Sequence, residues 1–237
     1  MKLSRETRVC LLLGAALLLT ILLPPGFSAL GDQRLIGRLV TQPLNERSAE
    51  QAPASLVDKL NLIASYNNQQ SESVVMASQR QTPEDKSYSA EPFLFALEGL
   101  KRLRENEAFP QVNLDTGYQR AEYKLHTYMD MAQPAMSAQV WELPLYTESF
   151  NAYVWMDAES HQIYQFYLGS GRQEPEAIDQ ESFIRAWGDY LGLTLLELTT
   201  KDTGTARAVY QAGEKTVAYV IAFGEGRSLE VNLDDEQ

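Results

Sequence analysis

The sequence predicts an α+β fold: an N-terminal transmembrane helix, then antiparallel sheet with helices packed on one face, arranged as two tandem halves. Three observations predict it. Residues 9–30 form an apolar stretch, and residues 89–105 and 179–192 place apolar side chains at helical spacing. Each of the two helical segments is followed by a group of segments rich in aromatic and β-branched residues, which is typical of strands.

The apolar stretch is the first predicted element. Its length of about 22 residues matches the roughly 20 that the hydrocarbon core of a bilayer requires, and three basic residues precede it: Lys2, Arg5 and Arg8. This flank predicts that residues 1–8 stay in the cytoplasm and that the rest is exported, as in a single-pass cell-membrane protein. A cleaved signal peptide has the same composition, and Ala29-Leu30-Gly31 offers a cleavage site. We predict the permanent anchor, with a cleaved and secreted protein as the alternative.

Cys10 is the only cysteine of the chain. It lies at the start of the apolar stretch, whereas the cysteine of a lipoprotein follows that stretch, so we predict an ordinary buried cysteine. The exported part then contains no cysteine, which excludes a disulfide framework. The exported domain must therefore be stabilised by its own apolar core.

The charge balance disfavours two classes of partner. The whole chain has a net charge of −12, and the part after residue 31 is at about −14, because residues 1–31 carry three basic side chains and one acidic one. A surface of this sign repels nucleic acid and anionic lipid headgroups. The predicted membrane contact is therefore the N-terminal helix, and no nucleic-acid partner is expected.

The exported part is predicted to begin with a stalk and a short helix. Ser55 can cap a helix in which Leu56, Leu60 and Ile63 have helical spacing, and residues 73–78 are predicted as a short strand. The predicted organisation is a cytoplasmic N-terminus (1–8), a transmembrane signal-anchor (9–30), a stalk (31–54), a first half (55–170) and a second half (171–237).

The first half continues with the helix at 89–105. Ser89 can cap this helix, and Phe93, Leu97 and Leu100 form one apolar stripe. Gly99 lowers helix stability by up to about 1 kcal/mol, so we expect a packing reason for it. Four strands are predicted to follow the helix, at 121–129, 138–143, 150–157 and 161–168.

The second half begins with the helix at 179–192, which Asp179 can cap and Gly192 can end. Within residues 216–223 both alternating sets of side chains are apolar, which predicts a central strand covered on both faces. In all, three strands are predicted after the helix, at 206–213, 215–224 and 228–233.

No motif in the sequence predicts catalysis. The two histidines, His126 and His161, lie within predicted strands or hairpins, where surface or turn positions are the ordinary interpretation. The sequence contains no G-x-S-x-G elbow, H-E-x-x-H pair, cysteine pair or glycine-rich phosphate loop. It therefore predicts no catalytic residue, no cofactor-binding residue and no metal ligand, and indicates that the protein is not an enzyme.

An acidic and aromatic region raises an alternative. Glu142, Asp157 and Glu159 could suggest a sugar cleft, since glycosidases need paired carboxylates. The aromatic residues near them are Trp141, Tyr153, Trp155, Tyr164 and Tyr167. Aromatic residues at strand spacing more often fill a core or a sheet face, and we favour that interpretation. The acidic tail at 234–237 lacks the spacing of a calcium loop and is predicted to be a solvated terminus.

The hairpin "WMDAESHQIYQFYL" (155–168) resembles a motif of PepSY-like and related cystatin-like extracytoplasmic modules, in which two strands flank a D-x-E-T-G-K-I turn. Asp157, Glu159 and Ile163 match this pattern. The residues that depart from it are Ser160, His161 and Gln162. Histidine at the glycine position must accept a positive φ, which it tolerates better than most residues but less comfortably than glycine.

The wider order also resembles that of uncharacterised single-pass Firmicute membrane proteins, over residues 55–233. The shared features are helices like "LVDKLNLI" and "FLFALEGLKRL", a strand like "VWEL", and the hairpin. The resemblance implies PepSY/cystatin-like halves in a non-enzymatic binding or regulatory module. Such a module contacts a protein, a peptide or an envelope component, and we expect it to use a sheet face or an edge strand. The alternatives are an extracytoplasmic hydrolase of cell-wall material and a secreted peptidase inhibitor.

Overall fold

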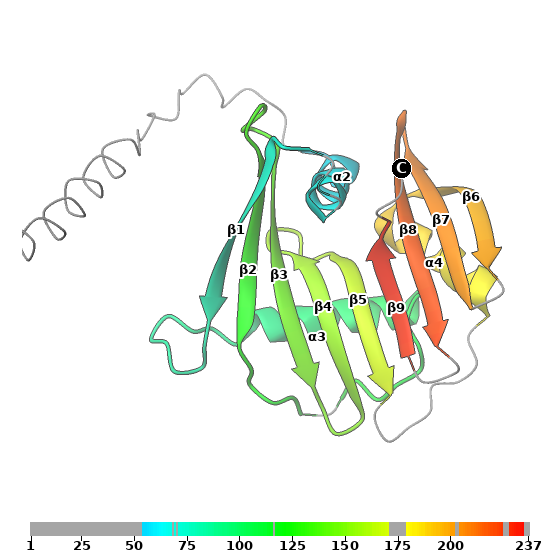
Figure 1. The fold of residues 1–237 in the computed structure, drawn as a ribbon. Helices are drawn as coiled ribbons and strands as arrows, with labels where there is room; N and C mark the ends of the chain where they lie inside the picture. Colours follow the sequence, from blue (N-terminus) through cyan, green and yellow to red (C-terminus); the bar gives the residue numbers. More distant parts are fainter. Residues whose placement is uncertain are drawn as a thin grey trace, which may run out of the picture. The chain divides into compact units, whose positions relative to one another are not determined.

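The computed structural model describes residues 54–67, 69, 71–115, 117–170, 179–201, 204–224 and 228–234 (Figure 1). Within these ranges lie three helices: α2 (Leu56–Asn67), α3 (Glu91–Glu105) and α4 (Gln180–Leu191). The same ranges contain nine strands: β1 (Val74–Gln81), β2 (Tyr123–Asp130), β3 (Ser137–Tyr146), β4 (Phe150–Asp157), β5 (Ile163–Ser170), β6 (Thr194–Lys201), β7 (Thr205–Ala212), β8 (Lys215–Gly224) and β9 (Ser228–Leu233). The predicted segments 1–8 and 9–30, with Cys10, and residues 31–53 of the predicted stalk lie outside the described residues.

The nine strands form one antiparallel sheet in the order β1-β2-β3-β4-β5-β9-β8-β7-β6. The first five strands are neighbours in chain order, and the last four are neighbours in reverse chain order. The junction is the pairing of β5 with the final strand β9, where Phe166 lies opposite Val231. This pairing joins both parts of the chain into one continuous sheet (Figure 1).

The predicted fold class is therefore wrong. We expected a transmembrane helix and two tandem α+β halves, whereas the described residues form mostly one large antiparallel sheet with three helices. The physical reason is that alternation of apolar side chains specifies a strand but not the strand that pairs with it. Among the residues that the structure describes, no helix is both long enough and apolar enough to cross a bilayer.

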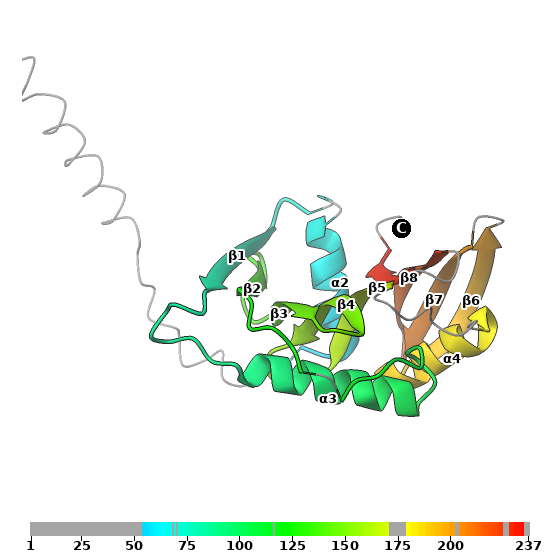
Figure 2. The same ribbon diagram turned by 90° about the horizontal axis from the view of Figure 1, so that it is seen from below.

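The helices also lie on both faces of the sheet rather than on one. Figure 2 shows α2 on one side of the sheet and α3 and α4 on the other. We call these sides the α2 face and the α3/α4 face. The side chains of β4 alternate between them: Val154 points to the α3/α4 face, whereas Asp157 points to the α2 face and contacts Lys59 of α2.

The α3/α4 face carries much of the apolar core. Each fully buried Val, Leu, Ile, Phe or Met side chain there contributes about 1.5–3 kcal/mol, and β4 supplies three of them: Phe150, Val154 and Met156. Gly99 of α3 lies so close to the sheet that an added Cβ would be 2.9 Å from Ile163 Cδ1. The packing reason that we expected for this glycine is confirmed.

Helix α2 lies on the opposite face. The predicted cap is confirmed, because Ser55 Oγ accepts a hydrogen bond from the Asp58 amide at 3.3 Å and the Asp58 carboxylate reaches back to the Ser55 amide at 3.3 Å. The helix contacts β1, β2, β3, β8 and β9. Since β4, β5 and β9 separate β3 from β8 in the sheet, the sheet must bend around α2.

The predicted helices at 89–105 and 179–192 are confirmed as α3 and α4. Gly192 ends α4 with a left-handed φ of 70°. Strand β6 was not predicted. It is an edge strand next to β7, with most of its side chains exposed, so it lacks the apolar alternation that marks a half-buried strand.

Candidate functional site

Part of the α2 face carries no helix among the described residues. In Figure 1, α2 lies over the upper part of this face, and the lower ends of β3, β4 and β5 have no helix in front of them. Pairing places Tyr153 opposite both Pro144 and Tyr167, and opposite residues of an antiparallel pair point to the same face. By alternation, Tyr146 and Trp155 point to this face too.

We call Tyr146, Tyr153, Trp155 and Tyr167 the open aromatic face. Tyr153 and Tyr167 are each 36% exposed, whereas Tyr146 and Trp155 are half-buried. Aromatic side chains that only stabilise a fold are normally covered, because each buries a large apolar area. The exposed neighbours Tyr153 and Tyr167 therefore make this face the candidate site of the described residues.

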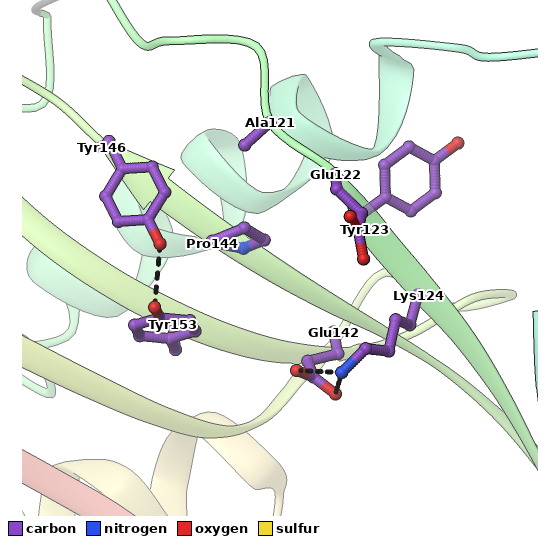
Figure 3. Close-up of a pocket in the computed structure, with 8 residues that line it drawn as sticks. All are labelled: Ala121, Glu122, Tyr123, Lys124, Glu142, Pro144, Tyr146 and Tyr153. Carbon is purple, nitrogen blue, oxygen red and sulfur yellow. Dashed lines mark hydrogen bonds and ion pairs between the residues drawn. The ribbon is translucent and has the colours of Figure 1, made fainter. Parts of the chain in front are cut away.

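A pocket lies next to this face, between the start of β2 and strands β3 and β4 (Figure 3). Its volume is about 290 Å³. The hydroxyls of Tyr146 and Tyr153 are hydrogen-bonded at 2.8 Å, and their rings are nearly perpendicular at 88°. This bond fixes both rings at the rim of the pocket. The lining residues are Ala121, Glu122, Tyr123, Lys124, Glu142, Pro144, Tyr146 and Tyr153.

The other end of the pocket is charged. Glu142 accepts a hydrogen bond from His126 Nε2 at 2.7 Å and pairs with Lys124 Nζ at 3.2 Å. The bond from His126 lowers the pKa of the Glu142 carboxyl below its ordinary value, burial opposes the shift, and Lys124 adds to the lowering. The buried Nδ1 of His126 has no hydrogen-bond partner within the described residues. Glu142 is therefore an ionised group whose charge is already compensated.

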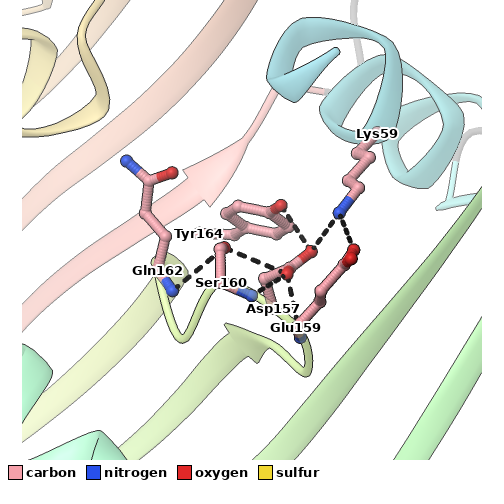
Figure 4. A network of polar contacts seen from close by, with 6 residues as sticks. All are labelled: Lys59, Asp157, Glu159, Ser160, Gln162 and Tyr164. Carbon is pink, nitrogen blue, oxygen red and sulfur yellow. Dashed lines mark hydrogen bonds and ion pairs between the residues drawn. The ribbon is translucent and has the colours of Figure 1, made fainter. Parts of the chain in front are cut away.

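Asp157 is the centre of a second polar network, at the turn between β4 and β5 (Figure 4). Its Oδ1 accepts bonds from the amides of Glu159 at 3.0 Å and Ser160 at 2.7 Å, and from the Ser160 hydroxyl at 3.0 Å. Its Oδ2 accepts a bond from the Tyr164 hydroxyl at 2.7 Å and pairs with Lys59 Nζ at 3.0 Å. Both oxygens are thus fully engaged within the protein.

Opposing effects determine the ionisation of Asp157. Burial raises the pKa of its carboxyl, but the bonds from the Ser160 amide, the Tyr164 hydroxyl and the Lys59 ammonium together hold the pKa below the ordinary value. Burial, together with the bond to Asp157, raises the pKa of Tyr164 far above its ordinary value. Asp157 is therefore an ionised acceptor that shapes the turn, and its 0% exposure leaves no surface for a substrate.

The sugar cleft that the sequence raised as an alternative is not formed by these carboxylates. Glu142 pairs with Lys124 and His126, whereas Asp157 and Glu159 share Lys59. The Glu159 side chain is 86% exposed and Asp157 is buried. Three carboxylates in such different surroundings, with Glu142 on one lysine and Asp157 and Glu159 on another, do not face one another across a cleft as an acid and base pair must.

The aromatic residues named with that cleft divide between the two faces. Tyr153, Trp155 and Tyr167 lie on the open aromatic face, Trp141 lies on the α3/α4 face, and Tyr164 is buried beside Asp157. Sequence reasoning missed Tyr146. Its alternation with Pro144 along "ELPLY" could have placed it on the face of Tyr153.

His161 lies in the turn and has a positive φ of 58°, as the departure from the glycine of the motif predicted. The sequence did not reveal its packing. The imidazole stacks on Phe95 of α3, with ring centroids 3.9 Å apart, and on Trp141 at 5.7 Å. His161 thus belongs to an aromatic stack that joins the turn to α3.

The acidic tail differs from the prediction where it is described. Asp234 is only 6% exposed and forms an ion pair with Arg207 of β7. It is therefore a buried, paired carboxylate rather than part of a solvated terminus. Residues 235–237 lie outside the described residues.

Comparison with known proteins supplies no relative for this site. The chain matches no family model, no curated protein and no solved structure. The resemblance to PepSY-like and cystatin-like modules therefore stays a prediction.

Proposed function

We propose that the protein is a non-enzymatic binding module that holds a protein or peptide partner on the open aromatic face. The observation that carries this proposal is the pair Tyr153 and Tyr167, which lie opposite each other and are each 36% exposed. Tyrosine and tryptophan are enriched at protein interfaces, because a rigid ring offers a large contact area at small entropic cost and the hydroxyl still finds polar partners.

A macromolecular partner suits this geometry better than a small molecule. Small-molecule sites are concave, typically enclose about 300–1,000 Å³ and bury most of the ligand. The pocket beside Tyr146 and Tyr153 has a volume of about 290 Å³, whereas Tyr167 and Trp155 extend the surface beyond it across β4 and β5. A row of exposed aromatic side chains with a small pocket at one end suits a partner that places one side chain in the pocket and covers the tyrosines.

The charges near the face favour recognition over acid–base chemistry. Glu142 is ionised, pairs with Lys124 and accepts a hydrogen bond from His126, so it can orient a polar partner without taking up a proton. The half-buried Glu230 lies opposite Tyr167 on β9 and adds a carboxylate to the same face. These groups would form the polar rim that surrounds aromatic contacts in protein interfaces.

Site-specific photo-crosslinking tests the proposal. A photoreactive benzoylphenylalanine replaces Asn151, which is exposed and lies opposite Tyr146, in the full chain produced in its own cells. The matched control carries the same group at Leu94, which is 56% exposed on α3. We expect a discrete protein adduct from position 151 and none of that mass from position 94.

The same reporter measures what the tyrosines contribute. Truncation of interface anchors costs 2 kcal/mol or more, so Tyr153→Ala together with Tyr167→Ala should lower the yield of the position-151 adduct by about tenfold or more. Leu94→Ala should leave that yield unchanged. An adduct that forms equally well without the tyrosines, or no protein adduct from position 151, would refute the proposed function.

A further inference from the structure

Within the described residues, the sheet has two edges that no further strand pairs with, β1 and β6, and they differ in how they are protected. Edge strand β6 carries an irregularity between Leu195 and Glu197 and two charged residues, Glu197 and Lys201. Bulges and charges of this kind prevent a sheet edge from pairing with another chain. Edge strand β1 pairs with β2 through eight consecutive residues without a register shift, and its first six residues, "VVMASQ", carry no charge. Strand β1 is therefore the less protected edge.

The hydrogen-bonding groups of β1 alternate between β2 and the open edge. The Met131 amide donates to the Ser73 carbonyl at 2.8 Å, so the backbone of Ser73 faces β2. In an antiparallel ladder the residues that bond to a given neighbour alternate. The amides and carbonyls of Met76, Ser78 and Arg80 therefore face away from β2, toward the open edge.

Strand β1 is also complementary to itself in charge. Glu72 lies in a turn, two residues before the start of β1 at Val74, Arg80 lies near the end of the strand, and both are exposed. If two copies pair antiparallel about a two-fold axis at Met76, each Arg80 lies opposite the turn that carries the other copy's Glu72. The same register places the exposed Val75 opposite Ala77 of the other copy. It also places the outward amide and carbonyl of Met76 opposite the amide and carbonyl of the other copy's Met76, so that the two residues can hydrogen-bond to each other.

We propose that two copies of this chain associate through β1, with the two-fold axis at Met76, to extend the sheet across both molecules. Neighbouring registers lack the charge pairing: an axis at Ala77 places Arg80 opposite Val74. Arg80 already forms an ion pair with Glu122, and its side chain is 66% exposed, so the guanidinium can retain Glu122 and accept a second carboxylate. Isologous pairing about a two-fold axis is the commonest form of homo-oligomer.

Cysteine crosslinking of the full chain tests this register. In a Cys10→Ser background, Met76→Cys places two sulfurs on the two-fold axis. The Cα atoms of the two cysteines would be about 5.5 Å apart, which suits a disulfide. A mild oxidant should then produce a covalent dimer of twice the 26.7 kDa chain. Leu196→Cys on the opposite edge, where the side chain is 60% exposed, is the matched control and should remain monomeric.

Charge reversal distinguishes a specific dimer through β1 from disulfides that form by random collision. Arg80→Glu or Glu72→Arg alone should each lower the yield of the Met76→Cys dimer by about fivefold, because two symmetric surface ion pairs become repulsive contacts. The combination of both reversals restores the opposite charges and should restore the yield. Circular dichroism of each variant verifies folding. The proposal would be overturned if Leu196→Cys forms a dimer and Met76→Cys does not. It would also be overturned if neither single charge reversal changes the yield of the Met76→Cys dimer.

Discussion

Lys59 Nζ lies 3.0 Å from Oδ2 of Asp157, and this ion pair joins α2 to the turn between β4 and β5. The two residues are far apart in the sequence, and the carboxylate has no exposed surface. A second link holds the other side of the helix, where the Asn61 side chain donates to the Thr216 carbonyl of β8 at 3.0 Å. Together these contacts hold α2 against the sheet and leave the open aromatic face uncovered.

Asp157→Asn should destabilise the protein by about 2–3 kcal/mol, because it removes a buried charged acceptor and leaves Lys59 without its closest carboxylate. Urea denaturation measures this change. Glu159→Gln is the control: it also removes a carboxylate from Lys59, but its side chain is 86% exposed, so its effect should stay below about 1 kcal/mol. Equal effects of the two substitutions would show that the buried network contributes nothing.

The contribution of Asp157 should depend on pH. Its pKa in the folded protein is lower than the ordinary value of 3.8, so the unfolded chain binds a proton first as the pH falls. The stabilisation is therefore fully present above pH 3.8 and is lost as the pH falls through the lower pKa of the folded state. The stability difference between the native chain and Asp157→Asn should shrink across that range, in denaturation curves recorded at successive pH values. A difference that is constant down to pH 2 would contradict this.

His161 allows the cost of its positive φ to be separated from the value of its stacking. Both His161→Ala and His161→Gly remove the ring that packs on Phe95, but only glycine adopts a φ of 58° without strain. We expect the alanine variant to be less stable than the glycine variant by about 1 kcal/mol, measured as a difference in urea midpoint at equal slope. If alanine is as stable as glycine, the turn does not hold that φ in solution.

Individual elements could be predicted from the sequence because their signals are local. Periodic apolar residues predicted α3 and α4, and Ser55 predicted the start of α2. The segment "FNAYVWMD" predicted β4 with its observed bounds, Phe150–Asp157. Each depends on side chains a few residues apart. Strand β6 was not predicted for the same reason. An exposed edge strand shows little apolar alternation, so its sequence carries no local strand signal.

The arrangement of these elements could not be predicted in the same way. No local feature of the sequence around Phe166 or Val231 indicates that they become cross-strand partners, so one continuous sheet was mistaken for two tandem halves. The aromatic residues near Glu142 had the right spacing for a sheet face, yet the position of α2 decides which of them stay exposed. Asp157 was recognised as a turn residue, but its partner Lys59 comes from a helix remote in sequence.

Two glycines packed against aromatic or aliphatic side chains should respond differently to alanine. At Gly188 an added Cβ would lie 2.6 Å from Tyr210 Cε1, and the Tyr210 hydroxyl is fixed by a 2.7 Å bond to the Ile184 carbonyl. Gly188→Ala should therefore destabilise by about 1–3 kcal/mol. At Gly99 the contact is the end of the Ile163 side chain, 2.9 Å away, which can rotate. Gly99→Ala should cost less, and thermal unfolding of both variants measures the order. A reversed order would show that Tyr210 moves more easily than Ile163.

The open aromatic face should contribute little to folding if its role is binding. Tyr153 and Tyr167 are each 36% exposed, so replacing one of them by alanine removes less buried area than truncating a core tyrosine, and replacing both should cost at most about 2 kcal/mol. Tyr210→Ala, which truncates a fully buried ring, is the contrasting control and should cost about 3–5 kcal/mol, as for other large core aromatics. Urea denaturation of the three chains measures the difference. If the Tyr153 and Tyr167 double variant unfolds as easily as Tyr210→Ala, the two tyrosines are part of the core, and their exposure is no longer evidence for a binding surface.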